Sequence, residues 1–271
     1  MLPLFLALAL QDPLTIDEIM ARVAENQTRA EDARTQWVYA QDVMARMHRS
    51  NGKLAREESS QYVVTPTATG IKRERQHFEG KYENKGKLIS YDHDHYEYKG
   101  VDIDGDLISD MVEDFTSDKS KDGIRNSLFP LTAKQQKHYV YKLERREDYR
   151  GTSVYRVSFA PKHGEEDADW KGEVLIDAAE FQPLVVTTSL AWNMPGAVKV
   201  FLGTDIRNVG FKVTYKKVAD GVWFPATYGG EFSVKGLFLY KRTISLSVRN
   251  DDFKKADVAS KVTFETPKAP Q

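Results

Sequence analysis

The stretch Ser153–Asp177 decides the fold, because it holds two strands of alternating polarity joined by a polar loop. The strands read SVYRVSF (153–159) and WKGEVLID (170–177), and the loop opens at Pro161-Lys162. Side chains alternate between the two faces of a strand, so a strand with one apolar face must lay it on something apolar. On the first strand the apolar face is formed by Tyr155, Val157 and Phe159.

The same period of two recurs along most of the chain after Gln36. Asn51-Gly52 and Asp220-Gly221 are hairpin signals between such strands. The pattern predicts about a dozen long antiparallel strands, including one at 198–202 and one at 222–235 with a break near Gly229-Gly230. The fold class that follows is mainly β (α+β), with a large curved antiparallel sheet that forms an incomplete β-barrel.

Helices are expected in two places. Residues 15–33 have a helix start signal, since Thr15 and Glu18 have the spacing of a capping box. Residues 100–137 interrupt the strand pattern. Within them 101–106 is predicted to be a loop, 107–118 a short amphipathic helix, and the residues after Thr132 another short helix. The sheet is therefore expected to be covered by the N-terminal helix and this helical insertion.

Composition narrows the class of protein. The chain has 271 residues, 41% of them hydrophobic and 29% charged, which is typical of a globular protein. The formal net charge of −1 gives no indication of nucleic-acid binding. There is no cysteine, which excludes disulfides, thiol catalysis and cysteine zinc sites.

The N-terminus predicts export. Leu2–Leu10 is an apolar run too short to span a bilayer, and Ala7-Leu8-Ala9 fits a small-x-small cleavage signal, although no basic residue precedes the run. The alternative is a packed N-terminal strand. We expect a signal sequence at 1–11, a single domain at 12–265 and a tail at 266–271, with the mature protein soluble in a bacterial periplasm.

The strands between residues 155 and 190 resemble those of a known family. The sequences YRVSFAPK, WKGEVLID and FQPLVVTTSL resemble the outer-membrane lipoprotein-sorting (LolA-like) superfamily of exported bacterial proteins. A strand that ends in Pro-Lys is followed there by a glycine-containing strand that ends in Asp, matched here by Pro161-Lys162, Gly172 and Asp177. The resemblance covers about 12–260, and its motifs are structural.

The resemblance implies an unclosed barrel, capped by helices, that holds the acyl chains of lipid or lipoprotein. The partners it implies are a lipid or acylated lipoprotein and a membrane-anchored donor or acceptor protein, with no cofactor. It also implies an arginine that gates the lid. Arg73 and Arg75 lie in a strand of the right general region, but no motif around either one identifies it.

The residues expected to line the interior are the apolar side chains on the inner face of the sheet. We predict that this lining comprises Trp37, Tyr39, Tyr155, Val157, Phe159, Val174, Ile176, Val186 and Leu190. The sequence leaves open whether the interior is a ligand cavity or a filled core. The segment 192–203, apolar and broken by Pro195-Gly196, is expected to form a packed hairpin, a lid or a tip that touches a membrane.

Catalytic or metal chemistry has weaker signals. Asp92-His93-Asp94-His95 is a dense cluster of metal-type ligands, but two histidines two residues apart need a third ligand from elsewhere, so a solvated polar strand is expected. Asp102-x-Asp104-Gly105-Asp106 resembles a calcium loop with its glycine at the wrong position, and a polar turn is expected. No nucleophile or phosphate motif is present. We therefore expect neither an enzyme nor a bound metal.

Three hypotheses follow from the sequence. The first is a periplasmic carrier or binding protein for lipid or lipoprotein. The second is a periplasmic sensor that binds a membrane regulatory protein through its sheet edge or lid. The third is a metal-dependent enzyme centred on His93 and His95.

Overall fold

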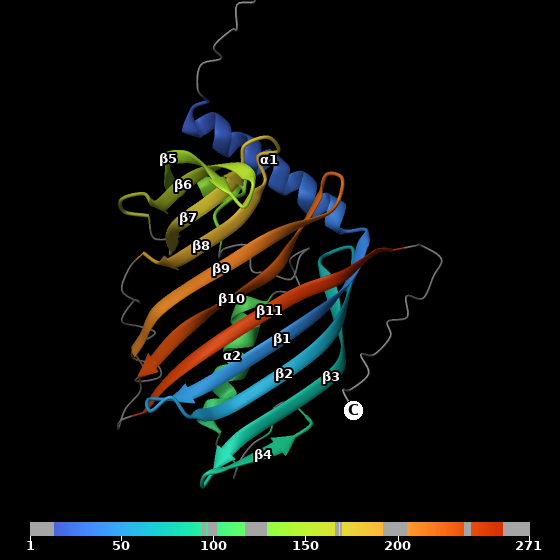
Figure 1. Ribbon diagram of the computed structural model, residues 1–271, viewed down its shortest axis with the longest axis vertical. Coiled ribbons are helices and arrows are strands. Elements are labelled where there is room, and N and C mark those ends of the chain that lie inside the picture. The colour runs from blue at the N-terminus through green and yellow to red at the C-terminus, as the bar shows by residue number, and fades with distance from the viewer. Residues whose placement is uncertain are drawn as a thin grey trace, which may run out of the picture.

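Eleven strands and three helices make up the described part of the chain (Figure 1). The computed structural model describes residues 14–93, 96, 102–116, 129–165, 168, 170–191, 205–235 and 240–256. The helices are α1 (Ile16–Arg34), α2 (Ile103–Phe115) and α3 (Ala133–Gln136). The strands are β1 (Trp37–Arg49), β2 (Leu54–Pro66), β3 (Ile71–Asn84), β4 (Lys87–Tyr91), β5 (Tyr139–Tyr149), β6 (Thr152–Pro161), β7 (Trp170–Asp177), β8 (Pro183–Leu190), β9 (Asp205–Ala219), β10 (Val222–Lys235) and β11 (Lys241–Lys255).

All the strands belong to one antiparallel sheet. Their order is β4-β3-β2-β1-β11-β10-β9-β8-β7-β6-β5, so the last strand pairs with the first and two meanders join side by side. The long β1–β11 ladder makes this join, with Val43 opposite Val248 and Met47 opposite Ile244. The edge strands β4 and β5 each pair with one neighbour among the described strands. The predicted fold class, a mainly β protein with an incomplete barrel, is confirmed.

Helix α1 begins where the sequence predicts. The Thr15 hydroxyl accepts a hydrogen bond from the Glu18 amide (3.3 Å), and the Glu18 carboxylate accepts one from the Thr15 amide (2.8 Å). Ile19 and Val23 are fully buried on the side that meets the sheet. The capping box thus fixes the start of the helix, and the apolar stripe fixes the face it buries.

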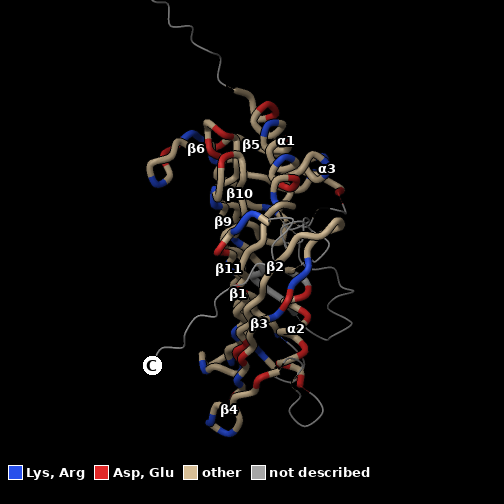
Figure 2. Tube along the Cα trace, turned by 90° about the vertical axis from the view of Figure 1, so that its right-hand side faces the viewer, with Lys and Arg blue, Asp and Glu red and all other residues tan. Residues whose placement is uncertain are grey.

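The helices lie on one face of the sheet. Helix α1 contacts β10 and β5, whereas α2 contacts β1, β2 and β11. Seen edge-on, the strands form one layer, and α1, α2 and α3 lie together on one side of it (Figure 2). We call the helix-covered side the inner face and the opposite side the outer face.

The main core lies between the inner face and the helices. It contains Ile19, Val23 and Ile108 from the helices and apolar side chains from both halves of the sheet. A second cluster lies around Tyr39, Val64, Ile71 and Phe224, at the end of the sheet where α1 leads into β1. A third, small cluster of Val154, Leu175 and Val185 lies on the outer face.

Two details of the sequence prediction are wrong. Residues 102–106 are not a loop: Asp102 is the N-cap of α2, and the helix runs from Ile103. Strand β10 is not broken at Gly229-Gly230. A Cβ there would lie 2.0 Å from the carbonyl oxygens of Leu246 and Gly210 respectively, so these glycines let neighbouring backbones approach within a continuous strand. The predicted strand at 198–202 lies outside the described residues.

Replacing Ile19 with alanine should destabilise the protein by about 2–5 kcal/mol, because Ile19 is fully buried where α1 meets the sheet. The measurement is the denaturant midpoint, with Glu25→Ala as the control. Glu25 is an exposed residue of the same helix, and its replacement should change stability by less than about 0.5 kcal/mol. Equal effects of the two substitutions would mean that α1 is not docked through this stripe.

Candidate functional site

Helix α2 covers part of the inner face with an amphipathic surface. Ile108 is 1% exposed within the main core, and Leu107, Met111 and Val112 pack against that core. Asp106 and Glu113 are exposed on the other side of the helix. The apolar side of α2 is thus held by non-directional burial, which by itself does not fix where the helix sits along the sheet.

The N-terminus of α2 is held by a carboxylate that serves two partners. One oxygen of Asp102 accepts a hydrogen bond from the Gly105 amide at 3.1 Å and so caps the helix. The other oxygen accepts a hydrogen bond from the guanidinium of Arg56 on β2. Gly105 has to be small, because a Cβ there would lie 2.7 Å from Nη1 of Arg56. The first turn of α2 and the guanidinium of Arg56 are therefore in close contact, and Asp102 binds both.

Arg56 is the most unusual side chain of this region because it is charged and only 2% exposed. Its Nε donates to Glu58 at 2.7 Å, its Nη2 donates to the Tyr96 carbonyl at 3.0 Å, and its guanidinium lies 5.0 Å from the centre of the Tyr91 ring. The Tyr91 hydroxyl donates to the same Glu58 oxygen at 2.7 Å. Each nitrogen of the guanidinium thus has an acceptor, as a buried charge requires.

The surroundings of Arg56 keep its guanidinium protonated. Burial opposes the charge of Arg56, but the neighbouring Glu58 and the hydrogen bonds to Glu58 and Asp102 raise its pKa above the usual value. Burial, together with the adjacent Glu58 carboxylate, raises the pKa of Tyr91, so the phenol remains a donor. Arg56 therefore stays charged and Tyr91 stays neutral at physiological pH.

A second anchor holds the same end of α2 to β11. Asp104 accepts a hydrogen bond from the Tyr240 hydroxyl at 2.6 Å, and Arg242 donates to both oxygens of this carboxylate, at 3.0 Å from Nε and 3.1 Å from Nη2. The guanidinium of Arg242 lies 4.4 Å from the centre of the Tyr240 ring. Two carboxylates of the first turn therefore reach two strands, β2 and β11, on opposite sides of β1.

One polar group is buried among the apolar side chains of the sheet. The side-chain amide of Gln41 donates to Asn250 at 3.0 Å and to the Tyr228 hydroxyl at 3.3 Å, and Asn250 donates to the Pro225 carbonyl at 2.9 Å. Gln41 is 1% exposed, and its carbonyl oxygen has no hydrogen-bond partner. This oxygen could accept a hydrogen bond from a donor in this part of the interior.

The predicted lining residues are divided between two clusters. Seven of them lie in or against the main core: Tyr155, Val157, Phe159, Val174, Ile176, Val186 and Leu190. Trp37 and Tyr39 belong to the second cluster, where both pack edge-on against Phe224. Their role in binding a ligand stays a prediction.

Two arginines meet the first turn of α2, Arg56 and Arg242, and the sequence analysis selected neither. The guanidinium of Arg73 lies 5.5 Å from the centre of the Tyr62 ring, and that of Arg75 lies 5.5 Å from the Phe78 ring. Residues 55–58 read as Ala-Arg-Glu-Glu, an ordinary solvated strand. The only signal in the sequence was the alternation that puts Arg56 and Glu58 on one face.

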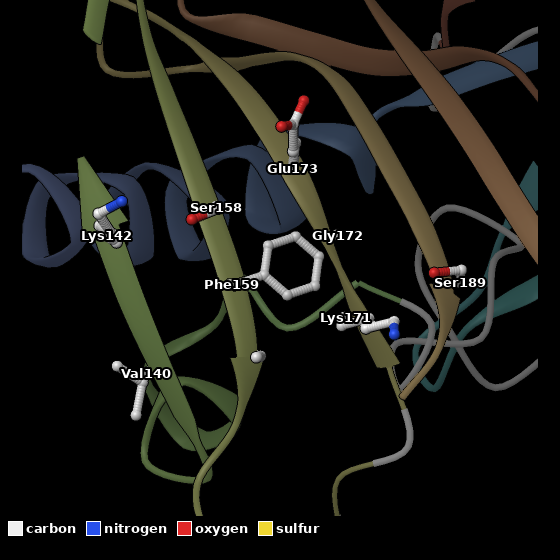
Figure 3. Close-up of a pocket in the computed structure, with 9 residues that line it drawn as sticks. Val140, Lys142, Ser158, Phe159, Lys171, Gly172, Glu173 and Ser189 are labelled. Carbon is white, nitrogen blue, oxygen red and sulfur yellow. The ribbon is translucent and has the colours of Figure 1, made fainter. Parts of the chain in front are cut away.

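The outer face has a separate, open hollow of about 460 Å³ over β5–β8. Figure 3 shows it with α1 behind the strands and with Lys142, Ser158, Lys171 and Glu173 among its lining residues. Lys142 bonds Glu144 at 3.0 Å, and the Ser158 hydroxyl donates to the same residue at 2.6 Å. These charged and polar side chains lie beside the apolar Val140 and Phe159.

The predicted metal-type cluster is described only in part. Asp92 and His93 are exposed and 3.2 Å apart, whereas Asp94 and His95 lie outside the described residues. Within the described ranges, no three His, Asp or Glu side chains are grouped so that they could hold a metal ion. The segment 192–203 also lies outside the described residues.

Comparison with known proteins gives similarities of fold only. No protein-family model matches the chain, and no curated protein sequence does. Among solved structures, the chain is similar to a domain assigned as an outer membrane lipoprotein-sorting protein from Vibrio parahaemolyticus. That pair has a TM-score of 0.38, 11% identity, and coverage of 89% of this chain and 93% of the other.

Two further solved structures are similar to the chain. A LolA superfamily protein from Nitrosomonas europaea has a TM-score of 0.31 and 12% identity over 86% of this chain and 94% of its own. MucB of Pseudomonas aeruginosa, solved in complex with MucA, has a TM-score of 0.23 and 10% identity over 87% of this chain and 99% of its own. The lipoprotein-sorting proteins that the sequence resembles are thus among the structural neighbours. At such low scores no residue role is transferred from them.

Replacing Arg56 with methionine should destabilise the protein by about 3–5 kcal/mol, because it leaves Asp102 and Glu58 without their buried cation. Amide hydrogen exchange should accelerate most strongly within α2. The control is Arg46→Met on β1, since Arg46 is 48% exposed, bonds Glu57 at 2.5 Å, and should contribute less than about 1 kcal/mol. Unchanged protection of α2 in the Arg56 variant would show that this arginine does not hold the helix.

Proposed function

We propose that the protein binds acyl chains of lipid or of an acylated protein between the inner face of the sheet and its helical cover, with α2 as the movable part. The proposal rests on the two different kinds of contact that attach α2 to the sheet. Its first turn is tied to β2 and β11 by ion pairs, whereas the rest of the described helix rests on the core through apolar side chains.

Such an attachment suits a lid. Burial of apolar surface contributes similar free energy whether the surface meets protein or a lipid chain, so an acyl chain can replace part of the contact between Ile108 and the sheet. Each methylene that leaves water contributes about 0.8 kcal/mol, and a long chain can therefore offset the displaced packing. The ion pairs at the first turn keep the helix attached during the exchange.

The cellular setting in the proposal is the bacterial periplasm. It rests on the apolar run at 2–10 and on the resemblance in sequence. No helix in the described residues is long and apolar enough to cross a membrane. The partners would be a donor that releases the acylated cargo and an acceptor that takes it. No cofactor is required.

Binding of an acyl chain is tested with a fluorescent fatty-acid analogue and two variants of one strand. Leu190 and Leu184 are both partly buried on β8, but Leu190 packs against the main core and Leu184 against the outer cluster. Leu190→Glu should weaken binding of the probe at least about tenfold, because a carboxylate would then face the acyl chain. Leu184→Glu should leave the affinity unchanged. Equal affinities in the two variants would contradict an inner-face site.

Movement of α2 can be followed directly because the chain contains no cysteine. A single Glu113→Cys variant, labelled with an environment-sensitive dye, places a reporter on the exposed side of α2. Saturating fatty acid should change its emission, whereas the same label at Lys134 of α3 should report no change. An equal change in emission from the labels on α2 and α3 would contradict a movement confined to α2.

Native mass spectrometry of the protein purified from periplasm would identify the natural cargo.

A second candidate function is binding of a regulatory protein at a sheet edge. Strand β5 pairs only with β6 among the described strands, and its Val140 is 56% exposed. An open edge can accept a further strand. The charged residues along the outer side of β5 act against such pairing, so lipid binding is the better-supported proposal.

A further inference from the structure

The strand register brings several hairpin ends to one end of the sheet. Arg49 at the end of β1 lies opposite Arg242 at the start of β11, and Lys235 at the end of β10 lies opposite Lys241. On the other side, β2 starts at Leu54 beside the turn from β1, and the turn from β3 to β4 lies between Asn84 and Lys87. We call this end of the sheet, from β4 to β10, the basic rim.

The basic rim carries five lysines that are exposed and that have no ionic partner among the described side chains. They are Lys53, Lys85, Lys87, Lys235 and Lys241. They are spread over six neighbouring strands, β4 to β10, which spans about 24 Å at a spacing of about 4.8 Å between strands. A row of this length matches an extended anionic surface better than a single small anion.

Three carboxylates near the basic rim already have cationic partners. Glu83 pairs with Arg49, Glu57 bonds Arg46 and Lys81, and Asp104 is occupied by Arg242 and Tyr240. The exposed carboxylates Asp106 and Glu113 belong to α2, on the helix side of the sheet. Asp205 of β9 lies opposite Lys235 in the strand register, and the four remaining lysines have no ionic partner among the described side chains.

Apolar side chains lie beside these cations. The described part of the chain has four exposed large hydrophobic residues, and three of them are at this end. Leu88 (54% exposed) and Ile89 (37%) follow the turn that carries Lys85 and Lys87, and Ile103 (56%) begins α2. Exposed apolar groups among lysines are the combination that adsorbs to the headgroup region of a bilayer.

We propose that the basic rim docks the protein on the surface of an anionic membrane. The lysines bind lipid phosphates, and Leu88 and Ile89 enter the interface beside them. The proposal does not rest on acyl binding at the inner face, because adsorption to a surface needs neither an open interior nor a movable α2.

The test is sedimentation of the full chain with vesicles made of equal parts phosphatidylglycerol and phosphatidylcholine, or of phosphatidylcholine alone. The protein should sediment with the anionic vesicles at low salt and lose most of this binding at high salt. It should not sediment with the neutral vesicles. Each lysine near an anionic surface raises the partition coefficient between membrane and water about fivefold. The double variant Lys53→Glu, Lys87→Glu should therefore bind at least about tenfold more weakly.

The matched control is Lys212→Glu, Lys216→Glu, which makes the same change in net charge at two exposed lysines of β9 away from this end. This control should retain at least half of the binding of the native chain. The proposal is wrong if the two double variants lose binding equally, because net charge alone would then explain the effect. It is also wrong if the native chain does not sediment with the anionic vesicles. Affinity for the fatty-acid probe should be the same in both double variants, which separates failure of this proposal from failure of the proposed function.

Discussion

The buried ion pair between Arg56 and Asp102 is the interaction on which the placement of α2 depends. A guanidinium that is 2% exposed is tolerated only where acceptors surround it, and Glu58, Asp102 and the Tyr96 carbonyl supply them. Apolar burial holds α2 against the sheet without specifying its position, whereas a hydrogen-bonded ion pair is directional and fixes one end of the helix. The sheet therefore determines where the helix begins, and the apolar stripe of the helix determines what it covers.

The two long helices are attached to the sheet by different kinds of interaction. Helix α1 leads into β1 after two residues, buries Ile19 and Val23 in the core, and ends at Arg34, whose Nε donates to the Trp223 carbonyl at 2.6 Å. Helix α2 has ion pairs at its first turn and apolar packing beyond it. Displacing α1 would cost core packing and strain its link to β1, whereas α2 can exchange its apolar contacts for those of a ligand. This asymmetry is the physical reason for proposing α2 as the movable part.

The sequence predicted those parts of the fold that depend on neighbours along the chain. The capping box of Thr15 and Glu18, the Asn51-Gly52 turn and the alternating strands are local signals, and each is confirmed. The pairing of β1 with β11 joins residues about two hundred positions apart, and no local pattern encodes it. Arg56 was missed for the same reason, since a charged residue in a polar strand is ordinary until a distant helix covers it. Asp102 was assigned to a loop because its partner, Arg56, cannot be read from the neighbouring sequence.

The two proposed activities meet at adjacent residues. Lys241 belongs to the basic rim, and Arg242, the next residue, binds Asp104 at the first turn of α2. Both oxygens of Asp104 accept hydrogen bonds from this guanidinium. Side chains alternate along β11, so Lys241 points away from the face on which Arg242 binds Asp104. A phosphate bound by Lys241 would therefore leave the pair of Arg242 and Asp104 in place, so the proposed docking at the basic rim and the proposed movement of α2 do not depend on each other.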